Sequence, residues 1–566
     1  MHMSAGVLTR RFAPRLIVCV GVFSIAFAAS CGLGYLMEGH DVASSALLAL
    51  FTAVISLFLL LCAARLLDRF ETSRAARARG ASNPAIGWKF ALGCFGTIWL
   101  CWLFWFALYY PGCTSTDSMD ILKMVLGLPF EADHFRYETI NSHHPLLYVA
   151  FVAIFANVGY TWGGMGASLA LCTFAQMTIV AACSTYAAMW TARRTGSKAA
   201  GVAVAVFFAI NPLVGRYSVT LWKDVPFAAA LLVFCLNCFD AIASEGRFFG
   251  RISFKIGFVA SALAVFFLRS NGFVVVAIAV VAMVLSCTRA QKTVAAWGAG
   301  ALVVLLIVQS VASGAFGIVS AHFSESMAIP LQQIGRTVAS GGELTEEQAA
   351  FIDQVIPLEE LEEAYRPDTP NSIKFSPYFN DEFLDGHKLE FLATWISMFP
   401  ANAGTYVSAW LWETIGFWYA GMSSWLVADA GYEVGSDGEW GGVDPLLPEG
   451  VADSGLLSGY APTSIFARIL PFLCRAACLG WLIAAAFALQ VGREKTLQAA
   501  AISPLLVYWL TFLLAAPISN EFRYLFALHY AFPFIVFCLL APAFGFRGRA
   551  NPREGVEGRE SPHSAH

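Results

Sequence analysis

The sequence predicts an all-α polytopic membrane protein with about twelve transmembrane helices, interfacial helices and a small, mainly helical outer loop domain. Three observations predict this class. The chain of 566 residues is 58% hydrophobic and 13% charged, whereas about a quarter of the residues of a soluble domain are charged. Segments such as 92–110, 165–190 and 497–516 run almost without charge for about 20 residues, the length that a helix needs to cross a bilayer. Basic residues gather in loops between such segments.

The N-terminal residues 1–87 are expected to form a two-helix membrane hairpin followed by a basic cytoplasmic loop. Arg10, Arg11 and Arg15 precede an apolar run that ends in Ala-Ala-Ser-Cys at 28–31, a pattern that secretion signals and lipoprotein cleavage sites also show. The run is long for a signal, and further apolar segments follow at once. These features favour a retained first helix.

The placement of Lys and Arg decides which of about fourteen apolar segments cross the membrane. The segments 145–160 and 406–425 are expected to lie in the interface, because counting either one alone as a crossing would put basic loops outside. Both termini are then cytoplasmic, and most of the 35 Lys and Arg lie on the inner side. The remaining twelve crossings are approximately 14–36, 43–67, 88–110, 165–190, 199–214, 224–244, 254–269, 271–287, 293–313, 464–490, 497–516 and 523–544.

After the N-terminal hairpin, four regions are expected. They are a transmembrane core at 88–313 with an outer loop at 111–144, an acidic extracytoplasmic region at 314–463, C-terminal transmembrane helices at 464–544 and a disordered cytoplasmic tail at 545–566. The acidic region is interpreted as a solvated outer surface, with cation binding as the alternative. Within it, Thr345-Glu-Glu-Gln348 predicts a capping box that opens a short helix, and Pro357 predicts the start of the next one.

The loop after the third expected crossing holds the leading catalytic candidate. Pro111-Gly112 ends that crossing, and the Thr-Ser-Thr-Asp run at 114–117 is a natural cap for a helix along the membrane surface. Asp117 either caps this helix or acts as a general base, because a carboxylate at an apolar boundary can activate an acceptor hydroxyl. Asp120 follows three residues later on the same helical face and is the second catalytic candidate.

His143 and His144 precede Pro145 at the end of the same loop. Adjacent histidines point to different sides of most backbones, which argues against a metal site made by this pair. A structural role is the alternative to a contact with a phosphate or a sugar hydroxyl. Both histidines are candidates for substrate binding.

The second outer loop brings Lys223 and Asp224 to the start of the next crossing, beside Trp222. One interpretation is an interfacial anchor and ion pair with the tryptophan at headgroup level. In the other, Lys223 binds an anionic donor, while Asp224 contacts the substrate or joins Asp117 in holding a divalent cation.

Arg269 and Arg523 are expected at the same outer boundary, where positive charge opposes the usual trend. Phosphate binding explains such residues, because a guanidinium forms bidentate charge-assisted hydrogen bonds. Together with Lys223 and Tyr524, they form the predicted donor-phosphate site.

At these residues the chain resembles the membrane glycosyltransferases of the GT-C fold, which include protein mannosyltransferases, aminoarabinose transferases and oligosaccharyltransferase catalytic subunits. It is most similar to an uncharacterised bacterial group of multi-pass proteins. The resemblance runs roughly from 92 to 540 in the order of its elements. It rests on Asp117, His144-Pro145, Lys223-Asp224, Arg523-Tyr524 and the stretch 329–338.

The resemblance implies that Asp117 is the catalytic base or a metal-binding carboxylate. It implies a polyprenyl-phosphate-linked sugar as donor and an envelope glycan, lipid or protein as acceptor, within the lipid bilayer of the cell membrane and without nucleic acid. Metal-dependent members carry an adjacent acidic pair and Asp-x-Asp or Asp-x-Glu, where this chain has Asp117-Ser-Met-Asp120 and Lys223-Asp224. No cofactor is therefore assigned, and a divalent cation stays open.

The leading hypothesis is a glycosyltransferase that works at the extracytoplasmic face. A multi-pass transporter or flippase is the first alternative, and it predicts polar groups at mid-membrane depth and spans broken by Gly or Pro. A non-catalytic envelope protein is the second, and it predicts that Asp117, Lys223 and Arg523 lie far apart.

Overall fold

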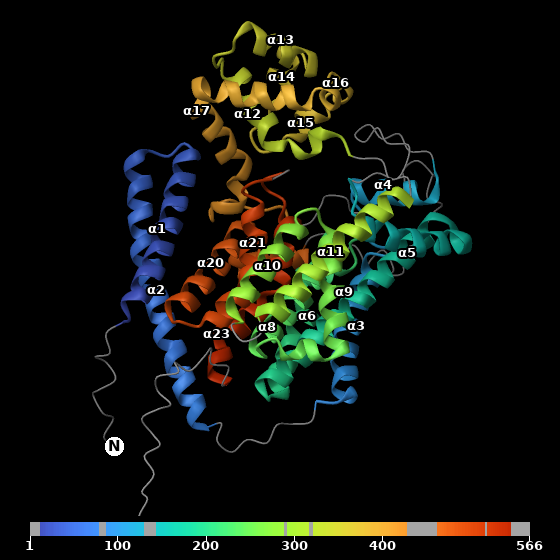
Figure 1. Cartoon of the computed structure of the whole chain (residues 1–566), viewed down its shortest axis with the longest axis vertical. Helices are drawn as coiled ribbons and strands as arrows, with labels where there is room; N and C mark the ends of the chain where they lie inside the picture. The colour runs from blue at the N-terminus through green and yellow to red at the C-terminus, as the bar shows by residue number, and fades with distance from the viewer. Residues whose placement is uncertain are drawn as a thin grey trace, which may run out of the picture.

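The computed structural model describes residues 12–77, 86–128, 143–287, 291–315, 321–426, 461–515 and 518–544. Within these ranges the regular elements are helices, joined by two isolated β-bridges. The helices form an elongated bundle with a smaller helical domain at one end (Figure 1). The protein is therefore of the all-α membrane class that the composition predicts. The expected tail at 545–566 lies outside the described residues.

The prediction of twelve crossings is wrong for the described part of the chain, which has six helices long and apolar enough to span a bilayer, or up to eight if each of two bent pairs is one span. Hydropathy shows how long an apolar stretch of the chain is, but it does not show how long the helix within that stretch is. Four of the expected crossings contain helices shorter than 18 residues. The six are α1 (Pro14–Met37), α2 (Val42–Arg77), α3 (Trp88–Leu108), α5 (Leu146–Thr195), α8 (Asp224–Ala243) and α11 (Gln291–Ala315). The bent pairs are α6 (Lys198–Ile210) with α7 (Pro212–Ser218), and η6 (Phe522–Leu525) and α22 (Phe526–Tyr530) with α23 (Phe532–Leu540). The shorter apolar helices are α9 (Ile252–Leu268), α10 (Gly272–Ser286), α20 (Ala476–Gly492) and α21 (Thr496–Thr511).

Helices α1 and α2 form the hairpin expected at the N-terminus, and α1 also packs on α20. Gly32 allows the close approach within the hairpin, since a Cβ there would lie 2.9 Å from the Cβ of Ala49. None of the apolar window of α2 is buried, which leaves its surface to the lipid. At the other end of α2, Arg493 pairs with Asp68 at 2.9 Å and with Glu71, which joins the hairpin to the bundle.

Helix α8 is the centre of the bundle, with 89% of its apolar window buried. It packs against α5, α9, α21 and α22, so elements from the middle and the end of the chain meet around it. Lys223 directly precedes α8 and Asp224 is its first residue. The packing around α8 places both residues close to the segment that carries Arg523.

Helix α5 consists of two helices that fold back on each other. Gly163 and Gly164 have non-helical backbone angles, and Gly164 has a φ of +66°, which favours glycine. The two halves are in contact, since the Ser168 hydroxyl donates to the carbonyl of Ala156 at 2.8 Å. This break separates the segment expected in the interface, 145–160, from the expected crossing at 165–190.

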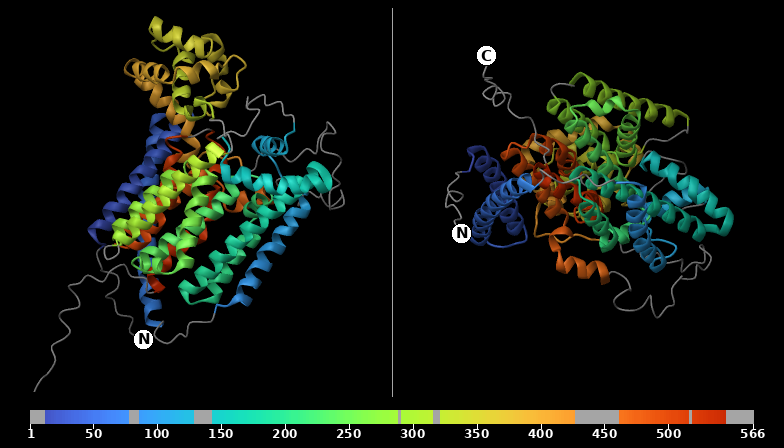
Figure 2. Two further views of the ribbon diagram at one scale, coloured as in Figure 1. Left: turned by 45° about the vertical axis from the view of Figure 1, so that its right-hand side comes forward. Right: turned by 90° about the horizontal axis from the view of Figure 1, so that it is seen from below.

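The outer domain is the small helical domain of residues 321–402, and Figure 2 shows it above the bundle from a second side. Gln348 N–H donates to Thr345 Oγ1 at 3.2 Å, and Thr345 N–H donates to Gln348 Oε1 at 2.9 Å, so the predicted capping box is confirmed. Pro357 directly precedes the next helix, as expected. A separate hydrophobic core holds this domain together. Its helices are α12 (Ala328–Ala339), α13 (Glu346–Val355), α14 (Leu358–Ala364), α15 (Asn371–Lys374), α16 (Asp381–Gly386) and the first half of α17 (Lys388–Trp418).

Helix α17 connects the outer domain to the bundle. It bends at Asn402, shortly after Pro400, where the backbone leaves the helical region. The Asn402 side chain accepts from Glu343 N–H at 3.0 Å and donates to Glu343 O at 2.8 Å, which fixes the bend. The second half of α17 then packs against α20.

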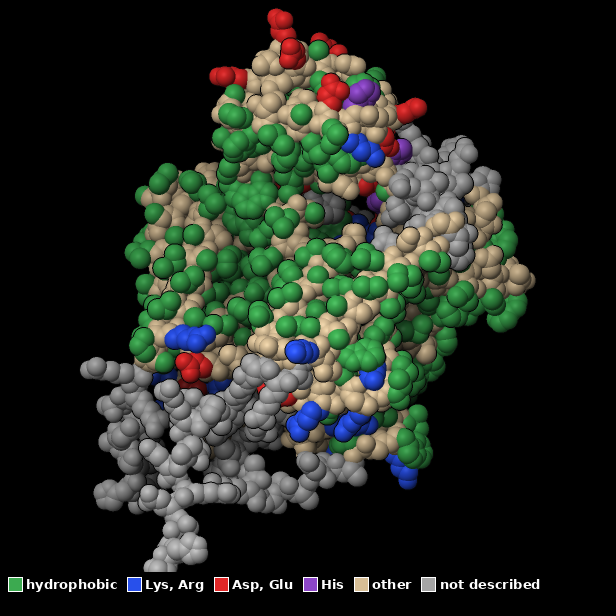
Figure 3. All heavy atoms as spheres, viewed as in Figure 1, with side chains coloured by type: hydrophobic (Ala, Val, Ile, Leu, Met, Phe, Trp, Pro, Cys, Tyr) green, Lys and Arg blue, Asp and Glu red, His purple; other side chains and the backbone are tan. Residues whose placement is uncertain are grey.

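Charged side chains are distributed unevenly along the molecule. Figure 3 shows Lys and Arg gathered mainly toward the end of the bundle away from the outer domain, and Asp and Glu on the outer domain. It also shows a hollow between the outer domain and the bundle, where acidic, basic and histidine side chains are visible. The candidate site residues lie at this junction.

Candidate functional site

Two loops at the end of the bundle nearest the outer domain are joined side by side at the site. Cys113 N–H donates to Val219 O at 2.9 Å, and Leu221 N–H donates to Cys113 O at 2.8 Å. These bonds hold the loop after α3 against the loop that precedes α8. The start of α4 (Thr116–Leu126) is therefore fixed next to Lys223.

Ser115, rather than Asp117, is the N-cap residue of α4. It forms a capping box with Ser118, whose Oγ accepts from Ser115 N–H at 3.2 Å. Trp222 Nε1 donates to Ser115 Oγ at 2.6 Å, and the Ser118 hydroxyl donates to Leu221 O, so the cap also binds the second loop. Because the serines cap the helix, the Asp117 carboxylate is available for other contacts. Helix capping is thus not the role of Asp117 in this structure.

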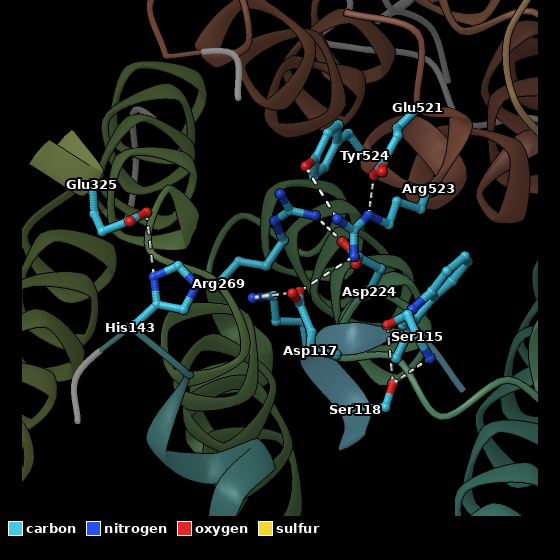
Figure 4. A network of polar contacts seen from close by, with 12 residues as sticks. Ser115, Asp117, Ser118, His143, Asp224, Arg269, Glu325, Glu521, Arg523 and Tyr524 are labelled. Carbon is cyan, nitrogen blue, oxygen red and sulfur yellow. Dashed lines mark hydrogen bonds and ion pairs between the residues drawn. The ribbon is translucent and has the colours of Figure 1, made fainter. Parts of the chain in front are cut away.

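The Asp117 carboxylate lies between two cations. Its Oδ2 is 3.5 Å from Lys223 Nζ and 3.3 Å from Arg523 Nη1 (Figure 4). Burial opposes the ionisation of Asp117, but the charges of Lys223 and then Arg523 outweigh it and hold its pKa well below the ordinary value. Burial in turn lowers the pKa of Lys223, and the charge of Asp117 opposes that shift. The three side chains form one coupled group.

Arg523 makes further contacts that orient its guanidinium. Its Nε pairs with Glu521, two residues earlier, and its Nη2 donates to the Tyr524 hydroxyl at 3.3 Å. The guanidinium carbon also lies 5.4 Å from the centre of the Trp222 ring, within the range of a cation–π contact. Arg523 is thus in contact with groups from both outer loops and its own segment.

A second ion pair lies beside the first. Arg269, at the end of α9, pairs with Asp224, the first residue of α8, and Asp224 is only 2% exposed. The Arg269 guanidinium carbon is 5.3 Å from the centres of both the Phe512 and Tyr524 rings. Tyr524 therefore contacts Arg523 through its hydroxyl and its ring, and Arg269 through its ring.

Lys223 and Asp224 are neighbours in sequence but pair in different directions. Lys223 faces Asp117, and Asp224 faces Arg269. The interpretation of Lys223 and Asp224 as an ion pair with each other is therefore not supported by the contacts. Their separate partners bring Lys223, Arg269 and Arg523 into one area, each opposite a carboxylate.

The two histidines contact different groups. His143 Nδ1 lies 3.5 Å from Glu325 Oε2 of the outer domain, and the same oxygen is 2.9 Å from Lys374 Nζ. His144 is 4% exposed, and a positive charge on its ring would lower the pKa of Asp117. Burial, followed by the charge of Lys223, lowers the pKa of His143 to about 2 and of His144 to about 4. Both rings are therefore neutral at physiological pH.

Asp120 lies one turn after Asp117 on α4, in a different electrostatic environment. Burial, and then the negative charge of Asp117, raise the pKa of Asp120 to about 6. That value suits a general base close to neutral pH. The pKa of Asp120 thus lies closer to neutral pH than the pKa of Asp117.

Some contributors were not among the predicted site residues. Glu521 stands two residues before Arg523, and this spacing could have drawn attention to it. Glu325 and Lys374 come from the outer domain, and no local pattern links them to His143. Among the described residues, no group of three or more His, Cys, Asp or Glu side chains is arranged to hold a metal ion.

A family of unknown function (DUF6020) matches residues 136–544 of this chain. The chain belongs to this family. No curated protein and no solved structure matches the chain. The matched region includes His143, Lys223, Arg269 and Arg523, whereas α4 with Asp117 precedes it. The family thus covers the cationic part of the site and the outer domain.

The site can bind an anion and accept a proton. Three cationic side chains lie close to one another, and each has a carboxylate partner that an anionic ligand could replace. Asp117 lies beside two of these cations as a proton acceptor, and Asp120 lies one turn further along the same helix.

Proposed function

We propose that the protein is a membrane glycosyltransferase that transfers a sugar from a polyprenyl-phosphate donor to a cell-envelope acceptor on the extracytoplasmic face. The observation that carries this proposal is the convergence of Lys223 and Arg523 on Asp117, with the Arg269–Asp224 ion pair beside them, at the junction of bundle and outer domain. A phosphate needs such cations, and an acceptor hydroxyl needs such a base.

Binding of the donor phosphate would change the pKa of Asp117. In the unliganded site, Lys223 and Arg523 hold the pKa of Asp117 low, which makes it a weak base. A phosphate that pairs with these cations competes with Asp117 for them. The pKa of Asp117 then rises, so that the base becomes active only when the donor is present.

The reaction follows from this arrangement. The acceptor hydroxyl attacks the anomeric carbon of the sugar, the bond from that carbon to the phosphate oxygen breaks, and the hydroxyl proton passes to Asp117. The polyprenyl phosphate leaves with one more negative charge. Lys223, Arg269 and Arg523 stabilise this charge as it develops. Attack from the side opposite the phosphate inverts the anomeric configuration.

A transfer assay tests the proposal. Purified protein in nanodiscs is incubated with polyprenyl phosphates that carry radioactive sugars, together with a membrane-envelope extract as the source of acceptors. Asp117→Asn should lower transfer by about 10²–10⁴-fold, the contribution of a positioned base. Glu347→Gln, which neutralises an exposed carboxylate on α13, is the matched control and should keep full activity. Full transfer by a folded Asp117→Asn protein would refute the mechanism.

A transporter or flippase is the second candidate, favoured by the broken helices. Helix α7 departs from α6 by 65°, and α23 departs from η6 and α22 by 41°. Broken spans are typical of transporters, although these breaks also place the loop before α8 and the segment of Arg523 at the site. Movement of a labelled lipid from one leaflet of a proteoliposome membrane to the other, without any transfer of sugar, would favour this candidate.

A further inference from the structure

The first half of α17 has an exposed apolar face. Leu389 is 83% exposed, Ile396 61% and Phe399 49%, and their spacing of seven and three residues puts them on one side of the helix. The opposite side of this helix, with Phe391 and Met398, is buried in the core of the outer domain. The first half of α17 is therefore apolar on two sides, one covered by the core of the outer domain and one uncovered.

This face is unusual within its domain. Tyr378 is the one further large hydrophobic side chain that is exposed among the described residues of the outer domain. Exposed apolar surface is thus concentrated on one helix rather than scattered, as single exposed hydrophobic residues normally are. Figure 3 shows hydrophobic side chains on the part of the outer domain that is nearest to the bundle.

The exposed face continues toward the lipid-facing surface of the bundle. Past the bend at Asn402, Val407 is 51% exposed on the descending half of α17. Figure 1 shows the first half of α17 running across the direction of α1 and α2, and the second half descending toward the bundle beside them. The surface of α2 carries exposed apolar residues such as Phe51, as a lipid-facing helix does.

We propose that the first half of α17 rests on the outer leaflet of the bilayer and inserts Leu389, Ile396 and Phe399 into the boundary between headgroups and acyl chains. A helix with an uncovered apolar face that lies across the direction of the spans fits this partner. Lys388, which is half exposed at the start of the helix, can place its ammonium group among the phosphates.

Contact with the bilayer would fix the height of the outer domain above the membrane. The same domain carries Glu325, whose carboxylate lies 3.5 Å from the His143 ring beside the candidate site. The hollow between domain and bundle would then be kept at the level of the lipid headgroups. This inference stands on the exposed face alone and does not depend on the proposed transfer reaction.

Photo-crosslinking to lipid tests the contact. The full chain is produced with p-benzoylphenylalanine at position 389, 396 or 399 and placed in nanodiscs of phosphatidylethanolamine and phosphatidylglycerol that carry radioactive phosphate. Phe51 on α2, which is 63% exposed, is the positive control position, and the exposed Gln354 on α13 is the negative one. All these positions are on the surface, so the label leaves the packing undisturbed. Strong labelling of the protein at 389, 396 and 399, close to that at 51, with background labelling at 354, is the expected result.

A second pair of variants links the labelling to the apolar face. Ile396→Asp, combined with the photo-reactive residue at 399, should cause loss of lipid labelling, because a carboxylate is driven out of the headgroup–acyl boundary. Gln354→Asp should leave it unchanged. Labelling at background level at 389, 396 and 399, while position 51 labels lipid, would overturn the proposal. So would crosslinking of 396 to a second copy of the chain in place of lipid.

Discussion

Two carboxylates of this protein, the partly buried Asp117 of the candidate site and the fully buried Glu413 of α17, are in very different surroundings. Asp117, at the end of the bundle next to the outer domain, has a lysine and an arginine within 3.5 Å. Glu413, on the second half of α17, is fully buried, and neither of its carboxylate oxygens has a hydrogen-bond partner among the described residues. The first is held charged and the second is held neutral.

The surroundings of Glu413 explain the difference. Among the described residues, Lys374 is a cation whose charge acts on Glu413, and it already pairs with Glu325 at 2.9 Å. The charge of Glu413 in turn acts on Tyr365. Helix α17 is not among the candidate spans, and burial there raises the pKa of Glu413 to about 8. Burial alone thus yields a neutral acid, whereas a charge needs partners close by.

The largest effect expected after that of Asp117→Asn comes from removing a cation beside Asp117. Arg523→Gln should lower kcat/KM for sugar transfer by about 100-fold, the usual loss when one charge-stabilising donor is removed. Arg523→Lys keeps the positive charge near Asp117 but not the paired geometry, and should lie in between. Steady-state kinetics with varied donor concentration measure both variants. Equal activity of the wild type and the glutamine variant would contradict a role in phosphate binding.

The pH dependence of transfer distinguishes the two candidate bases. The pKa of Asp117 is held well below its ordinary value, so a mechanism that needs this group ionised gives a kcat/KM that stays flat as the pH falls from 7 to about 5. Asp120 has a pKa of about 6. If Asp120 is the base, kcat/KM falls tenfold per pH unit below about 6. Asp120→Asn would then remove this decline together with most of the activity.

The contrast between Asp117 and Glu413 predicts that Glu413 makes the stability of the fold depend on pH. Its pKa is about 8 in the folded protein against an ordinary value of 4.5, so between these pH values the folded state keeps a proton that the unfolded state has lost. The unfolded state binds fewer protons in this window, and the stability of the fold therefore falls as the pH rises through it. Glu413→Gln removes this dependence.

Thermal unfolding in detergent measures this effect. The wild type and Glu413→Gln should have similar Tm values at pH 5, and the variant should unfold several degrees higher at pH 9. Glu347→Gln, at an exposed position, controls for the loss of one negative charge. A wild-type Tm that does not fall with pH relative to the variant would mean that Glu413 finds a partner in solution.

Local patterns in the sequence predicted local structure well. The cap at Thr345 and the helix that begins near Asp117 follow from turn chemistry within four residues. The placement of Lys223 and Arg523 beside Asp117 was also anticipated, because positive charge at an outer boundary calls for an anion. The contact of His143 with the outer domain was not anticipated, since no periodicity relates it to a residue as distant in sequence as Glu325.

The count of spans failed for a physical reason. Apolar composition says that a segment avoids water, but it does not give the length of the helix within the segment, and four of the expected crossings contain helices shorter than 18 residues. It also does not say whether a segment faces lipid or protein. The fully buried Glu413 shows the same limit, since its sequence neighbours are aromatic and apolar, as in an interfacial segment. Burial depends on which helices assemble around a segment, and that information is spread over the whole chain.

The smallest expected effect concerns the cap that frees Asp117 for its cations. Ser115→Ala removes the capping box of α4 and the acceptor of the Trp222 indole N–H. Loss of a serine N-cap costs about 1 kcal/mol, so the overall fold should survive. Local hydrogen exchange of the α4 amides should rise, and transfer should fall by a few-fold as Asp117 loses its fixed position. A threonine at 115 keeps the hydroxyl and should restore both. If Ser115→Ala changes neither exchange nor transfer, the position of Asp117 is set by Lys223 and Arg523 alone, and the cap is a consequence of the site rather than its support.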